Sequence, residues 1–131
     1  MNIERITFLS VEDVVYIHAY SIGKEGGSEG IRDQGLLESA VHTPRQTFDG
    51  EYLHPTIAGM GAAYLFHLAS NHPFLDGNKR VGARAMLAFL QVNGQPIRPS
   101  ADELVRVTLA VANHEMSKAE LTEWVERALS A

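Results

Sequence analysis

The chain has 131 residues, a hydrophobic content of 45% and a formal net charge of −5 at pH 7. This length suits one domain over residues 1–131, and the acidic balance argues against direct nucleic-acid binding, which needs a basic stripe. Without cysteine, disulfides, thiolate metal sites and a cysteine nucleophile are excluded. No apolar run reaches the roughly 18 residues that span a bilayer, and the N-terminus lacks a secretory signal, so we expect a cytoplasmic protein with no membrane partner.

Short elements are expected in the first half of the chain. Residues 4–9, ERITFL, alternate in polarity and predict one strand. Ser10 then opens a helix with one apolar face. The glycine-rich segment 23–30, GKEGGSEG, predicts a loop. Asp33 caps the next short helix. The polar connection 44–55 contains turn signals, and a small hairpin is expected there.

Helices are expected in the rest of the chain. Residues 56–70 follow the helical period and include small residues that allow another helix to approach closely. Residues 79–92, KRVGARAMLAFLQV, are apolar on nearly all sides and predict a central helix. Two capping boxes begin the last two helices: Ser100 with Glu103, and Ser117 with Glu120. The predicted fold class is therefore all-α, a compact helical bundle with at most one short strand or hairpin.

A polar stretch, NHPFLDGNKR at residues 71–80, separates two of the apolar helices. Pro73 lacks an N–H group and disfavours helical geometry in the residue before it. The preceding helix should therefore end by His72 and leave that imidazole at the mouth of a loop. Phe74 is the only large aromatic residue of the stretch, and we expect it to anchor the loop in the core.

The second half of this stretch suits a phosphate group. Asp76 and Gly77 form a turn signal, and Asn78 is a candidate cap for the following helix. The unpaired N–H groups at a helix start and the positive end of the helix dipole attract anions. Lys79 and Arg80 add full charges beside them, and an arginine can bind two phosphate oxygens at once. A base, a carboxylate and an anion-binding helix start thus lie within a few consecutive positions.

Two alternatives to a phosphate site remain open at this point. Each residue can be ordinary when taken singly: a surface histidine, a turn, a helix cap and solvated charges. A structural zinc site from His67, His72 and Asp76 is the other alternative. Its spacing is unfavourable, because His67 precedes His72 by five residues instead of the four that place two ligands on one helix face. A Walker P-loop is excluded, because the GxxxxGK[ST] pattern is missing.

The segment HPFLDGNKR, residues 72–80, resembles the signature of the Fic/Doc family at every fixed position. Residues 30–41, GIRDQGLLESAV, and the short chain resemble its Doc (death-on-curing) branch. This resemblance implies an enzyme in which His72 is the general base for a Ser, Thr or Tyr hydroxyl of a protein. Asp76 would help to hold Mg²⁺ on the phosphates of ATP. The same resemblance implies that the phosphates are bound by Gly77, Asn78, Lys79 and Arg80.

Two positions separate the branches of this family. AMP-transferring members read GNGRxxR, whereas here Lys79 replaces the second glycine and Ala83 the last arginine. Arg84 stands one residue late, which turns it about 100° around the helix. Doc members share both departures and transfer a phosphoryl group from ATP, with the nucleotide bound in the opposite sense. The resemblance thus implies a kinase-like, ATP-dependent phosphotransferase. An AMP transferase and a catalytically idle partner-binding domain are the alternatives.

The resemblance also implies partners. Doc proteins are toxins of toxin–antitoxin modules, which arrest translation by phosphorylating an elongation factor and are neutralised by a small antitoxin. An elongation factor and a cognate antitoxin are therefore expected partners. Residues 43–52, TPRQTFDGEY, lie where family members often place a flap that aligns the target peptide. Phe48 and Tyr52 are candidate docking residues in this segment, and a plain surface loop is the alternative.

One further segment matches a regulatory pattern. Residues 21–26, SIGKEG, fit the inhibitory pattern S/T-x-x-x-E-G/N of some Fic proteins, whose glutamate acts from a helix by pairing with the last arginine of the motif. Here the glycines predict a poor helix, and that arginine is replaced by Ala83. We interpret the match as chance, in which case inhibition comes from another chain.

Overall fold

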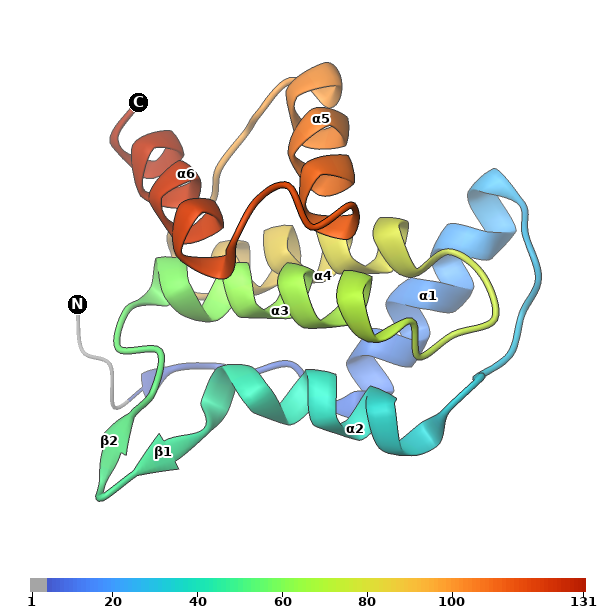
Figure 1. Cartoon of the computed structure of the whole chain (residues 1–131), viewed down its shortest axis with the longest axis horizontal. Coiled ribbons are helices and arrows are strands. Elements are labelled where there is room, and N and C mark those ends of the chain that lie inside the picture. The colour runs from blue at the N-terminus through green and yellow to red at the C-terminus, as the bar shows by residue number, and fades with distance from the viewer. Residues whose placement is uncertain (1–4) are drawn as a thin grey trace.

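The computed structural model describes residues 5–131, and helices account for most of them (Figure 1). The helices are α1 (Val11–Glu25), α2 (Gln34–His42), α3 (Ile57–Asn71), α4 (Asn78–Val92), α5 (Ala101–Ala112) and α6 (Lys118–Ser130), with a 3-10 turn, η2 (Thr43–Arg45). A two-stranded antiparallel hairpin, β1 (Thr47–Phe48) and β2 (Glu51–Tyr52), pairs Thr47 with Tyr52 and Phe48 with Glu51. The predicted all-α class and the small hairpin are confirmed. None of the helices in residues 5–131 is both long and apolar enough to cross a membrane.

Helices α3 and α4 pack closely against each other at the centre of the fold (Figure 1). Small residues permit this approach. A Cβ atom on Gly61 would lie 2.9 Å from Leu90, and one on Gly82 would lie 3.3 Å from the Leu65 carbonyl oxygen. Helices α2 and α6 pack on α3, and α1 packs on α4. The polar loop between α3 and α4 is therefore anchored at both ends by the best-packed pair of helices.

The strand predicted at residues 4–9 is wrong for its described part. Glu4 lies outside the described residues, and residues 6–10 have no regular secondary structure. Their backbone bonds to a side chain on α3 and to the residue that caps the end of α4, instead of to a second strand. The Leu9 N–H donates to the Tyr64 hydroxyl at 2.9 Å. The Asn93 side chain accepts from the Thr7 N–H and donates to the Thr7 carbonyl, each at 2.9 Å.

The loop predicted at residues 23–30 begins later than expected, because α1 continues to Glu25. Ser10 opens this helix as predicted, in a capping box with Asp13. Gly26 ends it with φ 86°, and its N–H donates to the Ile22 carbonyl at 2.8 Å. The last turn is held by tertiary contacts, since Ser21 and Ile22 are buried against the fold. Packing thus outweighs the low helix propensity of glycine in this turn.

Candidate active site

His72 lies directly after α3, in the left-handed region with φ 49° and ψ 56°, and its side chain is exposed. This backbone conformation is uncommon outside glycine, so neighbouring contacts must hold it. Arg32 supplies them, because its Nε donates to the His72 carbonyl at 2.7 Å and its Nη2 to the Asn71 carbonyl at 3.0 Å. The helix ends by His72 as the following proline predicted, and the imidazole stands at the mouth of the loop.

Buried side chains hold the loop after His72 in place. Phe74 is 1% exposed, and its ring stacks on the imidazole of His18, which α1 presents from its buried face. The His18 Nε2 lies 2.7 Å from the Asp76 carbonyl oxygen. Because a carbonyl oxygen only accepts, this nitrogen carries the proton of the bond. Pro73 is also buried, and its carbonyl accepts from the Arg32 and Asp33 N–H groups at 2.7 and 3.0 Å.

Asn78 has a different local role from the one predicted. The residue that caps α4 is Gly77, with φ 78°, and Asn78 is the first residue of the helix. The Asn78 side chain turns back to the loop, where its Oδ1 accepts from the Phe74 N–H at 2.9 Å and its Nδ2 donates to the Phe74 carbonyl at 3.0 Å. The cap prediction is therefore wrong. This buried amide fixes the path of the loop between His72 and the helix start.

Asp76 presents a carboxylate at the surface of the loop. Its Oδ2 accepts from the Ser28 N–H at 3.2 Å and its Oδ1 from the Gly77 N–H at 2.8 Å. These bonds from Ser28 and Gly77, with Arg80 nearby, hold the pKa of Asp76 below its ordinary value. The group is therefore ionised at neutral pH. One such carboxylate suits Mg²⁺, which proteins commonly bind through one or two carboxylates together with substrate phosphates.

The zinc alternative is contradicted. Within residues 5–131, no three His, Asp or Glu side chains lie close enough together to hold a metal ion. His67 instead meets α6, where its Nε2 lies 3.1 Å from the Lys118 Nζ. Burial, the Lys118 charge and His54 together lower the pKa of His67 to about 4. His67 is thus a neutral packing residue at the α3–α6 contact.

A cavity of about 280 Å³ lies over the start of α4, and the candidate residues share it. It is lined by His72, Leu75, Asp76, Gly77, Asn78, Lys79 and Arg80. The first-turn N–H groups of α4, at residues 78–80, have no acceptor among the described residues, whereas the Val81 N–H already bonds to the Gly77 carbonyl. The structure therefore brings an imidazole, a carboxylate, free amide donors and two cations around one space.

Phe48 and Tyr52 are not brought to this cavity. Their hairpin lies beside the N-terminal end of α3, whereas His72 follows the C-terminal end (Figure 1). A helix of this length separates the two by roughly 22 Å. Phe48 is 75% exposed, and Tyr52 packs on Phe8 with ring centroids 5.8 Å apart. Neither residue lines the His72 cavity, and docking of a target peptide by Phe48 and Tyr52 stays a prediction.

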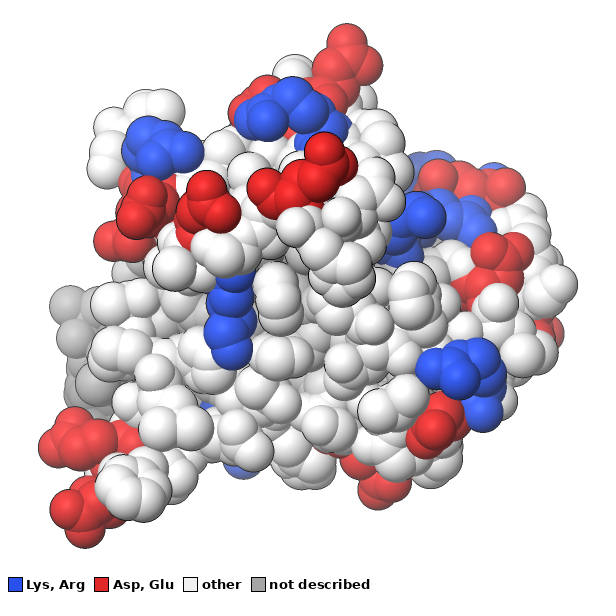
Figure 2. All heavy atoms as spheres, viewed as in Figure 1, with Lys and Arg blue, Asp and Glu red and all other residues white. Residues whose placement is uncertain are grey.

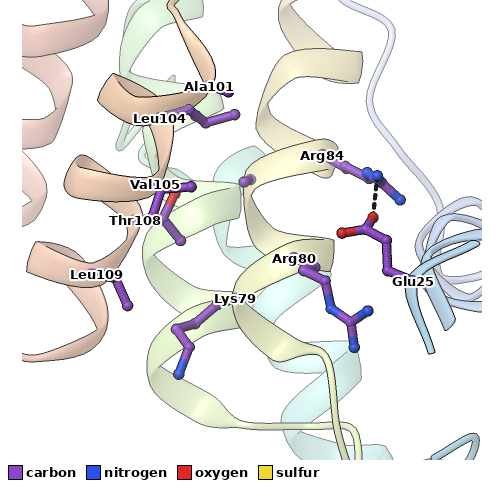
Figure 3. Close-up of a pocket in the computed structure, with 10 residues that line it drawn as sticks. Glu25, Lys79, Arg80, Arg84, Ala101, Leu104, Val105, Thr108 and Leu109 are labelled. Atoms are coloured by element: carbon purple, nitrogen blue, oxygen red, sulfur yellow. Dashed lines mark hydrogen bonds and ion pairs between the residues drawn. The ribbon is translucent and has the colours of Figure 1, made fainter. Parts of the chain in front are cut away.

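The SIGKEG segment differs from the expectation in one respect. Ser21–Glu25 is helical, and the Glu25 carboxylate pairs with the Arg84 guanidinium (Figure 3). Arg84 Nη1 also donates to the Ser21 hydroxyl at 2.8 Å. The prediction of a poor helix here is therefore wrong. The paired arginine is not the one that the family pattern names, because that position is Ala83. Glu25 does not line the cavity of His72.

The space-filling view shows how the charged side chains are distributed on one face of the protein (Figure 2). In the space-filling view, Lys and Arg atoms cluster where the surface is indented between α5 and the end of α1, and acidic atoms adjoin them (Figure 2). Elsewhere on this face the charges are dispersed. No broad basic stripe crosses the face shown, which agrees with the acidic composition of the chain.

Sequence reasoning missed three residues that shape the site. His18 supports Asp76 and Phe74, Arg32 holds the end of α3, and Ser28 binds the Asp76 carboxylate. His18 carried a signal, because it is a polar residue on the apolar face of its helix. Arg32 and Ser28 carried none, since each acts through contacts with residues about 40 or more positions away in the sequence.

Comparison with known proteins agrees with the geometry of the loop. The sequence profile of the Fic/DOC family matches residues 8–90, which include the whole motif. The chain is 37% identical over 95 residues to Toxin Doc of Mycolicibacterium smegmatis, a match covering 72% of this chain and 71% of that protein. It is 29% identical over 119 residues to Protein kinase doc of Escherichia phage P1, covering 91% and 93%. The chain therefore belongs to the Fic/DOC family, as the resemblance of its motif indicated.

Proposed function

We propose that this protein is a Doc-type toxin that transfers the terminal phosphoryl group of ATP to a hydroxyl side chain of a protein. The observation that carries the proposal is the shared cavity of His72, the ionised Asp76 and the free amide donors of α4. Two relatives carry the names Toxin Doc and Protein kinase doc, which supports both parts of the proposal.

The chemistry assigns a task to each group. The exposed imidazole of His72 accepts the proton of the target hydroxyl as its oxygen attacks the γ-phosphorus, and the bond from that phosphorus to ADP breaks. The N–H groups at the start of α4, with Lys79 and Arg80, stabilise the negative charge on the transferred group. Asp76 and the phosphates would hold Mg²⁺, which supplies further charge neutralisation. His18 and Asn78 act indirectly, because they position the loop.

An AMP transferase on the same fold is the second candidate. Lys79 lines the cavity at the position where AMP-transferring members have a glycine, which would leave more space there. Ala83 stands where those members have an arginine, so α4 lacks that cation. Both features favour the phosphoryl-transferring branch. We further propose a translation elongation factor as target, a small antitoxin as regulator and the cytoplasm as the place of action, because these follow from the Doc likeness.

The test uses ATP labelled at either the α or the γ phosphate. The purified protein is incubated with a bacterial lysate and Mg²⁺, and label in protein is measured beside the His72→Ala variant. We expect transfer from the γ position only, and loss of transfer in the variant. Label from the α position alone would reject the kinase proposal in favour of AMP transfer. Growth arrest by His72→Ala as strong as that by the parent would reject catalysis altogether.

A further inference from the structure

A pocket of about 410 Å³ lies between α6, α5 and the loop that precedes α5. Three arginines line it, Arg98, Arg106 and Arg127. Among the described residues that line it, Glu103 is the one acidic side chain and Trp124 the one aromatic ring. In the space-filling view, basic atoms lie over the N-terminal end of α5 and the C-terminal end of α6, with acidic atoms beside them (Figure 2). We call this site the arginine pocket.

The charge of one of the three arginines is already neutralised within the protein. Arg106 binds the Glu103 carboxylate through Nε at 3.1 Å and through Nη2 at 2.7 Å, and the Trp124 Nε1 donates to the same carboxylate at 2.9 Å. The bonds from Arg106 and Trp124 lower the pKa of Glu103 to about 2, so Glu103 is ionised and offsets the Arg106 charge. The same bonds fix the indole ring at the wall of the pocket.

The charges of Arg98 and Arg127 remain unused. Within residues 5–131, neither guanidinium group forms an ion pair, a hydrogen bond or a ring contact, and both side chains are exposed. The chain has a formal net charge of −5, to which these two arginines contribute +2, so the remainder carries −7. Two unpaired guanidinium groups around one hollow attract anions, and each can bind a carboxylate through two parallel hydrogen bonds.

The surroundings of the pocket favour a short acidic segment of a protein over a nucleic acid. A long polyanion would extend beyond the pocket and be repelled by the acidic groups on the adjoining parts of α5 and α6 (Figure 2). A nucleic acid also needs a basic stripe, and the face shown has none. Pro99 and Trp124 add apolar surface beside the charges. Arginine and tryptophan are residue types that are enriched where proteins bind one another.

We propose that the arginine pocket binds a short acidic segment of a partner protein, with Arg98 and Arg127 each paired with a carboxylate of that segment. Arg106 lies two residues after Leu104, which faces α4, and two helical residues turn the side chain by about 200° (Figure 3). The pocket is therefore on the opposite side of α5 from α4, and it shares no residue with the His72 cavity. A partner bound there would leave that cavity open, so the inference does not depend on the proposed function.

The test uses Trp124, which is the only tryptophan of the chain and lines the pocket, so its fluorescence reports on occupancy. The protein is titrated with a tetraglutamate peptide at low salt, and a tetraglutamine peptide is the uncharged control. We expect a saturable change in emission with tetraglutamate alone, and weaker binding when salt is added. Arg98→Gln and Arg127→Gln should each weaken binding by about two- to fivefold, as expected for exposed ion pairs. Lys24→Gln is the matched control, because Lys24 carries the same charge, is exposed and does not line the pocket.

Four outcomes would overturn the proposal. The first is an equal response to tetraglutamine, and the second is that the arginine variants bind no more weakly than Lys24→Gln. The third is that an oligouridylate with four phosphates binds at least as tightly as tetraglutamate, which would favour a nucleic acid. Calorimetry repeats each titration, and the fourth is that tetraglutamate produces neither heat nor a change in emission.

Two controls separate this inference from other effects. Thermal unfolding checks that each variant is folded, and both arginine variants should melt with the parent because their side chains have no partner to lose among the described residues. His72→Ala should bind tetraglutamate as the parent does, since His72 does not line the arginine pocket. Failure of the arginine pocket would therefore leave the kinase proposal standing, and loss of kinase activity would leave the pocket standing.

Discussion

The imidazole of His18 stacks on the ring of Phe74, with centroids 3.8 Å apart and planes inclined by 6°. The same imidazole donates from Nε2 to the Asp76 carbonyl, so one side chain of α1 holds two points of the loop. Between these points lies Leu75, whose N–H bonds to the Gly30 carbonyl at 3.0 Å. The position of the Asp76 carboxylate therefore depends on a residue remote from the motif in sequence.

Replacing His18 separates these two contacts. His18→Phe keeps a flat ring over Phe74 but leaves the Asp76 carbonyl without its donor, which should cost about 1 kcal/mol of unfolding free energy. His18→Ala removes both contacts and should destabilise the protein more. Urea unfolding measures the loss of unfolding free energy in each variant, and titration with ATP measures the effect on nucleotide affinity. If both variants match the parent in stability and in ATP affinity, His18 does not position the loop.

The side-chain amide of Asn78 is the second group that stabilises the loop between α3 and α4. Asn78→Ala leaves the N–H and the carbonyl of the buried Phe74 unpaired, so we expect a loss of about 2–3 kcal/mol of unfolding free energy. Asn78→Asp keeps an acceptor but loses the donor, and it should also be destabilising. Asn113→Ala is the control, because that asparagine is exposed and its side chain makes no hydrogen bond with the described residues. Comparable melting temperatures for the parent and Asn78→Ala would contradict the bracing role.

The helices and the motif were predictable because their signals are local. Capping residues such as Ser10 and Ser117 and the helix end at His72 follow from neighbours in the sequence. The strand at residues 4–9 failed because the alternating pattern does not reveal whether a partner strand exists. Asn78 was misassigned because an asparagine at a helix start can either cap the helix or hydrogen-bond to the preceding loop, as it does here. The extension of α1 to Glu25 depends on the burial of Ser21 and Ile22 and on the contact of Glu25 with Arg84, which no local pattern reveals.

The contact between α3 and α6 should make stability depend on pH. Burial, with the charges of Lys118 and His54, lowers the pKa of His67 to about 4 from an ordinary 6.5. Burial and then Lys118 also lower the pKa of His54. Between pH 6.5 and 4 the imidazole of His67 binds more protons in the unfolded chain than in the folded protein. The stability that the folded protein has above pH 6.5 is therefore lost progressively as the pH falls through this range. Urea unfolding at pH 7 and pH 5 should show this loss.

The variant His67→Gln tests which group causes the loss. It removes the titrating imidazole, so the difference in unfolding free energy between pH 7 and pH 5 should shrink. His42→Gln is the control, since His42 is exposed and should leave the difference unchanged. An unaltered pH difference in His67→Gln would assign the effect to other groups.

The Asp76 carboxylate should link nucleotide affinity to Mg²⁺. Its low pKa keeps it ionised, and its bonds to the Ser28 and Gly77 N–H groups aim it toward the cavity over α4. Asp76→Asn retains an oxygen that can accept one of these bonds but removes the charge that a hard cation needs. We expect Mg²⁺ to strengthen ATP binding to the His72→Ala protein and to have little effect once Asp76→Asn is added. Titrations with Mg²⁺ and with EDTA measure this difference. If Mg²⁺ strengthens binding equally in both proteins, Asp76 does not hold the ion, and its carboxylate serves only to fix the loop.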